Sequence, residues 1–169
     1  MVRFNIPASF ITDWARLTPG ELHYGYVNRW ISPVDVVELA LGYVVPADSK
    51  AGSIEEISLL LSDELDRLLH LMDQLVDSHD RVWSYLAIAW VHENQAEFED
   101  PFKTVDLLFA DFGYPQDVGE FVTFMPPPPG GVSGYPGLRQ RWQKYLEQKR
   151  SEFLRARISD AVDGSRESS

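Results

Sequence analysis

Two helix starts of the same design lie fourteen residues apart in this sequence, and they constrain the fold more than any other feature. Residues Thr18 to Glu21 read Thr-Pro-Gly-Glu, and Ser32 to Asp35 read Ser-Pro-Val-Asp. In each, the hydroxyl oxygen can accept a hydrogen bond from a backbone N–H of the first helical turn. The proline takes the first helical position, where the helix needs no N–H from it. The acid three residues after the hydroxyl completes a capping box. Further starts of this kind are expected at Ser53, Asp100 and Tyr114.

The spacing of apolar residues between these starts is that of amphipathic helices. The expected helices cover residues 7–17, 19–28, 33–43, 101–113, 115–124 and 138–158. A longer helical stretch from Ser53 could divide in two at Ser62 and Asp63. Its expected apolar face carries Ile57, Leu60, Leu61, Leu65, Leu68, Leu69, Met72, Leu75 and Val76.

Residues 82–91 are apolar on almost every side. Their valine, tryptophan, tyrosine and isoleucine would also suit a strand, but the run is long for one and leads directly into the polar residues 93–97. A helix that is apolar all round is packed on every side by others. The predicted fold class is therefore all-α: a compact array of helical hairpins around a buried central helix, with a C-terminal basic helix after a Pro/Gly hinge.

Composition divides the chain into four expected parts. Residues 1–125 form an acidic all-helical domain, and 126–137 form a linker that contains four consecutive prolines and several glycines. Such a linker is extended and semi-rigid, with a joint at the glycines. Residues 138–160 form a basic amphipathic helix, and 161–169 form a disordered tail.

The charge of the chain is unevenly placed. Residues 1–125 carry 21 acidic and 7 basic side chains, whereas residues 126–169 carry 5 acidic and 8 basic ones. An acidic body repels phosphate backbones, so nucleic-acid binding is not expected, and it attracts a basic protein partner. The alternative is that the acidity only keeps the protein soluble. The basic C-terminal helix is expected to dock on the chain's own acidic body, in preference to an external partner.

Several site classes have no support in the sequence. There are no cysteines, and no apolar run approaches the length that spans a membrane. The first residues lack the pattern of a signal peptide, so we expect a cytoplasmic protein without a membrane partner. His92 and Glu93 begin like a zinc-protease motif, but Ala96 stands where the second histidine is required. Residues 110–115 contain Asp-Phe-Gly and are interpreted as a helix end, with Gly113 as its left-handed cap. No cofactor or metal is predicted.

The candidate partner-binding residues are the acids of the longer helical stretch. Asp66 and His70 stand one helical turn apart there, so a metal-dependent enzyme of unrecognised type remains an alternative. The candidate acidic face consists of Asp63, Glu64, Asp66, Asp73 and Asp77.

Three segments resemble a small bacterial family of unknown function. They are residues 4–7 (Phe-Asn-Ile-Pro), residues 30–40 with Trp-Ile-Ser and the following Asp-Val-Val-Glu-Leu-Ala, and residues 100–115. The resemblance is expected over most of residues 1–125, with the tail after the prolines peculiar to this chain. The family is similar in size and character to immunity partners of bacterial toxins, and many such toxins are basic nucleases.

Together these observations predict a non-enzymatic cytoplasmic binding protein. The leading hypothesis is an immunity-type inhibitor that takes a basic protein toxin on its acidic face, since opposite charge accelerates association. The alternatives are a regulatory or scaffold module that recruits a partner through its C-terminal helix, and the unrecognised enzyme. The sequence does not decide between a monomer and a homodimer.

Overall fold

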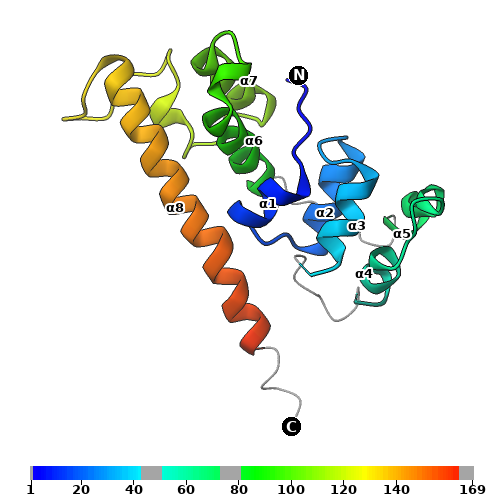
Figure 1. The fold of residues 1–169 in the computed structure, drawn as a ribbon. Coiled ribbons are helices and arrows are strands. Elements are labelled where there is room, and N and C mark those ends of the chain that lie inside the picture. Colours follow the sequence, from blue (N-terminus) through cyan, green and yellow to red (C-terminus); the bar gives the residue numbers. More distant parts are fainter. Residues whose placement is uncertain (1, 43–50, 73–80, 164–169) are drawn as a thin grey trace. The chain divides into compact units, whose positions relative to one another are not determined.

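The computed structural model describes residues 2–42, 51–72 and 81–163, and within these ranges the chain is helical and has no strand (Figure 1). This confirms the all-α prediction. The chain forms two compact units. Unit 1 comprises Met1–Arg3 and Ser84–Ser151, and unit 2 comprises Phe4–Trp83 and Glu152–Ser169.

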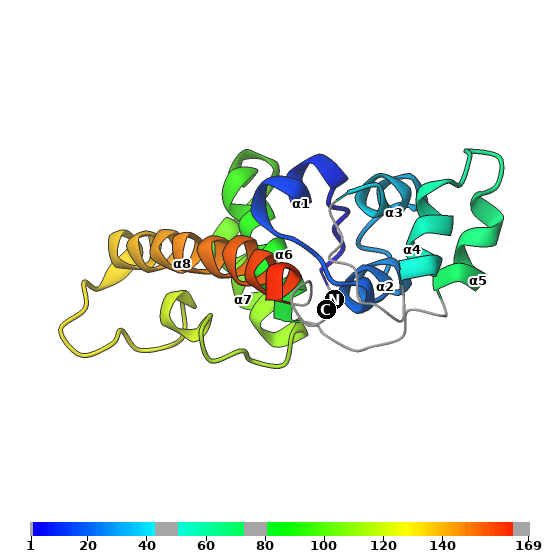
Figure 2. The same cartoon turned by 90° about the horizontal axis from the view of Figure 1, so that it is seen from below.

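Unit 2 contains the helices of the first half of the chain. Helix α3 lies beside α4, and α4 lies beside α5, in both views (Figure 1 and Figure 2). The helices expected over 7–17, 19–28 and 33–43 are all present, and the first is shorter at both ends. The bounds are α1 Ala8–Trp14, α2 Pro19–Val27, α3 Pro33–Ala40, α4 Ala51–Ser58, the 3₁₀ turn η1 Leu65–Arg67 and α5 Leu68–Met72.

Both predicted capping boxes are present. The Thr18 hydroxyl accepts from the Glu21 N–H at 3.3 Å, and the Glu21 carboxylate accepts from the Thr18 N–H at 2.9 Å. Ser32 and Asp35 exchange the same pair of hydrogen bonds at 3.2 and 3.3 Å. Each box satisfies two N–H groups that the start of a helix leaves free.

Asp35 also serves a second helix. Its Oδ1 accepts from the Ala8 N–H at 3.0 Å, across 27 residues of sequence. Helix α1 has Pro7 before it and no side-chain cap of its own. One carboxylate therefore stabilises the starts of both α1 and α3, and the sequence indicated only the second of these.

The core of unit 2 is built on aromatic rings. Trp30 stacks on Phe4 at 5.3 Å between ring centroids and meets Trp83 at 5.6 Å. The indole N–H of Trp83 donates to the Glu21 carbonyl oxygen at 2.8 Å, so its ring lies against α2. Gly25 makes this approach possible, because a Cβ there would stand 2.0 Å from Trp83 Cζ2. The sequence around Gly25 does not indicate which side chain approaches it.

The segment after residue 50 departs from two expectations. Helix α4 begins at Ala51, so Ser53 lies inside the helix and does not precede it. The helical stretch does divide near Ser62 and Asp63, as expected, but the break is wide: α4 ends at Ser58 and the chain resumes helical structure only at Leu65. The face predicted for one amphipathic helix therefore splits into buried and exposed parts.

Unit 1 holds most of α6, the elements between α6 and α8, and α8 as far as Ser151. Helix α6 contains the predicted central run, and every side chain from Val82 to Ala89 is buried. The prediction of a buried helix is thus confirmed. The bounds are α6 Arg81–Glu93, the 3₁₀ turn η3 Gln95–Glu97, α7 Pro101–Asp111, the 3₁₀ turn η4 Gly119–Phe121 and α8 Gly134–Asp163.

Helix α7 is bounded as the sequence predicts. The Asp100 carboxylate accepts from the Lys103 N–H at 3.0 Å at the start, and Gly113 adopts a left-handed backbone (φ 73°) after the end. Tyr114 is also left-handed (φ 62°), and its N–H donates to the Phe109 carbonyl oxygen at 2.8 Å. The expected helix over 115–124 is wrong in type: turns stand there, followed by the short η4, which begins at Gly119.

Helix α8 docks on unit 1 through aromatic side chains. Trp142 is 1% exposed and lies parallel to Phe121, with Phe102 edge-on at 5.6 Å. Tyr145 packs on Phe121 at 5.0 Å and on Tyr85 at 6.4 Å. The expectation that this helix docks on its own chain is confirmed for these residues.

The linker before α8 is fastened to the same unit. The Arg141 guanidinium donates to the carbonyl oxygens of Glu120 and Val132, at 2.5 and 2.7 Å. Helix α8 begins at Gly134, four residues before the predicted start, and ends at Asp163. A Cβ on Gly137 would stand 1.8 Å from the Val132 carbonyl oxygen, so the first turn of the helix lies directly against the linker.

Candidate protein-binding surface

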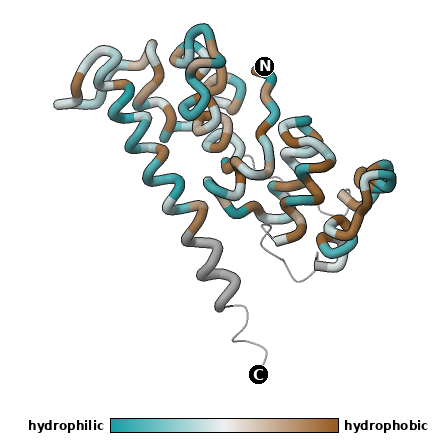
Figure 3. Tube along the Cα trace, in the orientation of Figure 1, coloured by the Kyte–Doolittle hydropathy of each residue, from teal (hydrophilic) through white to brown (hydrophobic). Residues whose placement is uncertain are grey.

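The residues in and just after the break between α4 and α5 include exposed acidic and leucine side chains. Three leucines that stand in or beside this break are largely exposed: Leu59 at 69%, Leu61 at 65% and Leu69 at 56%. Asp63 and Asp66 are exposed, and Glu64 is half-buried. Figure 3 shows hydrophobic and hydrophilic residues side by side in this part of the chain. We call Leu59, Leu61, Asp63, Glu64, Asp66 and Leu69 the acidic–leucine surface.

Glu64 organises the turn that carries this surface. Its Oε2 accepts from the Leu61 N–H at 3.2 Å, and its own N–H donates to the Leu61 carbonyl oxygen at 2.9 Å. Its other carboxylate oxygen stands 3.4 Å from the Arg67 guanidinium. Because its carboxylate is engaged within the turn, Glu64 has a structural role, while the charges of Asp63 and Asp66 face solvent.

Other side chains of the same segment are buried within unit 2. Ile57, Leu68 and Met72 are fully buried, and Leu60 and Leu71 are nearly so. The segment therefore combines buried side chains that fix its position with leucines that remain exposed. Exposed apolar side chains rimmed by charge are typical of surfaces that bind other proteins.

The structure brings together part of the predicted acidic face. Asp63, Glu64 and Asp66 lie on one turn, whereas Asp73 and Asp77 lie outside the described residues. The leucines were missed as surface residues: Leu61 and Leu69 were predicted on a buried face. The signal that could have found them was the Ser62–Asp63 break, because a break in the helix resets which side chains share a face.

The segment from Glu55 to His70 is strongly acidic. It contains five carboxylates and a single arginine, Arg67, whose partner is Glu64. A surface of this charge attracts cationic side chains, and it raises the local concentration of a basic partner. The carboxylates are Glu55, Glu56, Asp63, Glu64 and Asp66.

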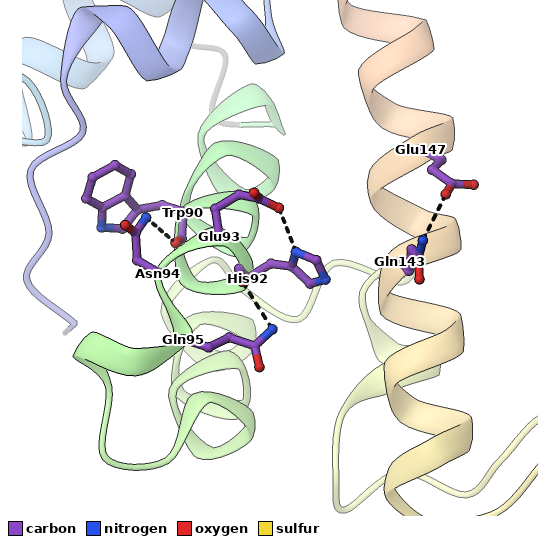
Figure 4. A network of polar contacts seen from close by, with 7 residues as sticks. All are labelled: Trp90, His92, Glu93, Asn94, Gln95, Gln143 and Glu147. Carbon is purple, nitrogen blue, oxygen red and sulfur yellow. Dashed lines mark hydrogen bonds and ion pairs between the residues drawn. The ribbon is translucent and has the colours of Figure 1, made fainter.

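His92 and its neighbours complete a helix end (Figure 4). The Nδ1 of His92 stands 2.9 Å from a Glu93 carboxylate oxygen, and its ring packs edge-on against Trp142. The side-chain amides of Asn94 and Gln95 donate to the carbonyl oxygens of Trp90 and His92. These polar groups therefore satisfy the last carbonyls of α6.

Two further kinds of site concern metal ions and membranes. Among residues 2–42, 51–72 and 81–163, no three side chains of the kinds that ligate metals gather closely enough to hold an ion. Asp66 and His70, which the enzyme alternative pairs, are both exposed to solvent. None of the described helices has both the length and the apolar character needed to cross a lipid bilayer.

The fold and this surface define an all-helical protein with an exposed acidic and leucine-rich turn. The chain belongs to a family described as an uncharacterised protein conserved in bacteria (DUF2247), whose model matches residues 8–150. No curated protein and no solved structure matches the chain. The predicted resemblance to a bacterial family of unknown function is confirmed. Its predicted extent was wrong, because the match continues past residue 125 over the linker and much of α8.

Proposed function

We propose that the protein is a non-enzymatic binding protein that holds a basic protein partner on the acidic–leucine surface, as an immunity-type inhibitor holds its toxin. The observation that carries the proposal is the exposure of Leu59, Leu61 and Leu69 around Asp63 and Asp66. The leucines supply apolar area to bury, and the carboxylates supply charge that selects a basic partner.

The two kinds of side chain contribute in different ways. Full burial of a leucine side chain contributes about 1.5–3 kcal/mol, which stabilises the complex once formed. Exposed carboxylates act mainly on the rate of encounter, which is faster when the partner is basic and slower at high salt. We therefore expect tight binding at low ionic strength and a strong salt dependence.

Helix α8 is less suited to recruit a partner. Its apolar side chains Trp142, Tyr145 and Leu146 are buried against unit 1, so the face that a scaffold module would offer is already covered. The basic side chains of its other face include Arg139 and Lys144, which are exposed. The acidic–leucine surface is therefore the better candidate, and the enzyme alternative stays a prediction.

The test is charge reversal on this surface. We expect the immobilised chain to capture a basic protein from a bacterial lysate, with release at high salt. The Asp63→Lys/Asp66→Lys variant is expected to bind the purified partner at least about tenfold more weakly by titration calorimetry. Among the described residues neither carboxylate has a hydrogen bond or ion pair in the turn, so the thermal unfolding midpoint should change little.

The matched control is Glu97→Lys/Glu99→Lys, which makes the same change in net charge at exposed positions of unit 1. It should bind as the unaltered chain does. A second variant, Leu61→Gln, removes exposed apolar area without altering charge and should raise the dissociation rate. The proposal is overturned if the double lysine variant keeps full affinity, or if both double variants lose affinity equally.

A further inference from the structure

Unit 2 contains an open pocket of about 520 Å³ between the end of α2 and the start of α3. Its lining is mixed, with four apolar and four polar residues. The apolar ones are Val27, Ile31, Pro33 and Leu69, and the polar ones are Asn5, Tyr26, Arg29 and Ser32. The volume lies in the range of pockets that hold small organic ligands. Apolar walls with a few polar groups are also typical of such pockets.

Arg29 has an unusual backbone for its residue type. It follows α2 with φ 61°, in the left-handed region, and its N–H donates to the Tyr26 carbonyl oxygen at 2.9 Å. The next N–H, of Trp30, donates to the Gly25 carbonyl oxygen at 2.9 Å, which closes the helix end. Glycine or asparagine fills this position with less strain. Arginine is thus a costly choice for the turn itself.

The charge of the Arg29 side chain makes no interaction in the described ranges that would offset this backbone strain. Within the part of the chain that the structure describes, no ion pair, hydrogen bond or cation–π contact involves its guanidinium. A residue in a strained backbone conformation is an indication of function where the surrounding packing does not require its side chain. The charge of Arg29 therefore remains available to a ligand in the pocket it lines.

The nearby charges restrict the kind of anion. The start of α3, where Ser32 and Pro33 line the pocket, already holds the Asp35 carboxylate on the Ser32 and Ala8 N–H groups. A dianion such as phosphate would be repelled by that carboxylate and would find one arginine to balance it. A monoanion with a small apolar body matches one guanidinium and the apolar part of this lining.

We propose that this pocket binds a monocarboxylate with a small branched apolar body, the carboxylate pairing with Arg29 and the body lying among Val27, Ile31, Pro33 and Leu69. Arginine forms two parallel hydrogen bonds with a carboxylate, which fixes the orientation of the ligand. The site is separate from the acidic–leucine surface except for Leu69, so failure of one proposal leaves the other standing.

The test uses 4-methylpentanoate and its uncharged amide on the full chain, followed by backbone amide NMR shifts. We expect saturable shifts for Val27 and Ile31 with the acid, and binding at least about tenfold weaker with the amide. A second arm uses acetyl-glycyl-leucine with a free carboxyl group. Tighter binding of this peptide identifies a chain end as the ligand, and tighter binding of the free acid identifies a small metabolite.

The decisive variant is Arg29→Asn, because asparagine tolerates the left-handed backbone and carries no charge. We expect an unchanged or higher unfolding midpoint together with at least about tenfold weaker carboxylate binding. Tyr114→Asn is the matched control, since it relaxes the same backbone conformation in unit 1 and should leave binding unchanged. The proposal is overturned if the acid gives no saturable shift, or if Arg29→Asn binds it as tightly as the unaltered chain.

Discussion

Gly25 is a residue at which the structure leaves no room for a side chain. The Trp83 indole is held by its hydrogen bond to the Glu21 carbonyl oxygen, so it cannot move away from a Cβ that would stand 2.0 Å from its ring. We predict that Gly25→Ala lowers the free energy of unfolding by about 3 kcal/mol, the upper range for overpacking a core. Urea denaturation measures the change.

Gly52 provides the control for this prediction, because it lies in α4 and a Cβ added there would meet nothing within 4 Å. Gly52→Ala should be neutral or slightly stabilising, since alanine favours the helix. Equal stability of the Gly25→Ala chain and the unaltered chain would contradict the close contact between α2 and Trp83.

Tyr85 makes the stability of the protein sensitive to alkaline pH. Burial raises the pKa of its hydroxyl well above the usual value of 10, and the positive charge of Arg150 offsets this only in part. Above pH 10 the unfolded chain loses the proton while the folded chain keeps it, so the free energy of unfolding falls as pH rises. Below pH 10 this contribution is fully present.

We predict that in Tyr85→Phe the free energy of unfolding falls less steeply above pH 10, whatever the effect of the substitution at neutral pH. Urea denaturation at pH 8 to 11 should show a smaller slope above about pH 10 than in the unaltered chain, by up to about 1.4 kcal/mol per pH unit. Tyr114 is 62% exposed, so Tyr114→Phe should leave the slope unchanged. Identical slopes for Tyr85→Phe and the unaltered chain would count against a buried, protonated Tyr85.

At the scale of single elements, Asp35 has the widest effect on how helices begin. Its carboxylate accepts from the N–H groups of Ser32 and Ala8, at the starts of α3 and α1. We predict that Asp35→Asn lowers the free energy of unfolding by about 1–2 kcal/mol, because the amide offers one oxygen where the carboxylate offers two. Thermal and urea unfolding both measure this.

The comparison variant is Asp100→Asn, since Asp100 caps α7 alone and asparagine is an equally good cap. It should lower the free energy of unfolding by at most a few tenths of a kcal/mol. If the two variants are equally stable, the hydrogen bond from Ala8 contributes nothing measurable, and α1 must be held by its buried side chains alone.

Elements with local signals were predictable from the sequence. The capping boxes at Thr18 and Ser32, the Asp100 cap and the Gly113 turn each depend on residues within four positions of one another. The helix start predicted at Ser53 was wrong, because a capping pattern inside a helix has the same sequence as one at its start. The helix expected over 115–124 failed because Pro115 favours a start but Gly119 weakens its continuation.

Features that depend on distant residues were not predictable. Nothing in the sequence around Asp35 indicates Ala8 as a partner, and Arg29 became notable only through its backbone and its pocket. The acidic half of the candidate site was found from composition. The leucine half was not, because it depends on where α4 ends.

At the scale of the whole molecule, unit 1 depends on α8. Trp142, Tyr145 and Leu146 are buried in it, and Lys149 pairs with Asp117 at 3.0 Å. We predict that truncation after Ser133 removes the tertiary structure of unit 1, seen as loss of near-ultraviolet circular dichroism and of hydrogen-exchange protection in α6 and α7. A loss of partner binding after truncation at Ser133 would therefore not show that α8 itself binds the partner, because unit 1 would also have unfolded.

Truncation after Asp163 is the matched control, because it retains all of α8. It should preserve protection in α6 and α7. Retained protection after truncation at Ser133 would mean that α6 and α7 form a stable core without the aromatic contacts of α8.

Sequence composition and compactness divide the chain at different places. Composition suggests a boundary at the prolines near residue 125, whereas the compact units change over after Arg3, Trp83 and Ser151. The opposite charges of the two parts correctly predicted that the basic helix α8 packs on residues of the same chain. The contacts that hold it are mainly aromatic, and ring packing cannot be read from the net charge of a segment.

The chain passes from one unit to the other at three positions, and this has a consequence for protein synthesis. Unit 1 includes residues up to Ser151, and unit 2 resumes at Glu152, so each unit contains a segment that the ribosome delivers late. Domains commonly fold one after another as they emerge, beginning at the amino terminus. Until α8 has emerged from the ribosome, Tyr85 of α6 and Phe102 of α7 lack the ring contacts that Tyr145 and Trp142 supply. We therefore expect these aromatic side chains to be open to chaperones during synthesis.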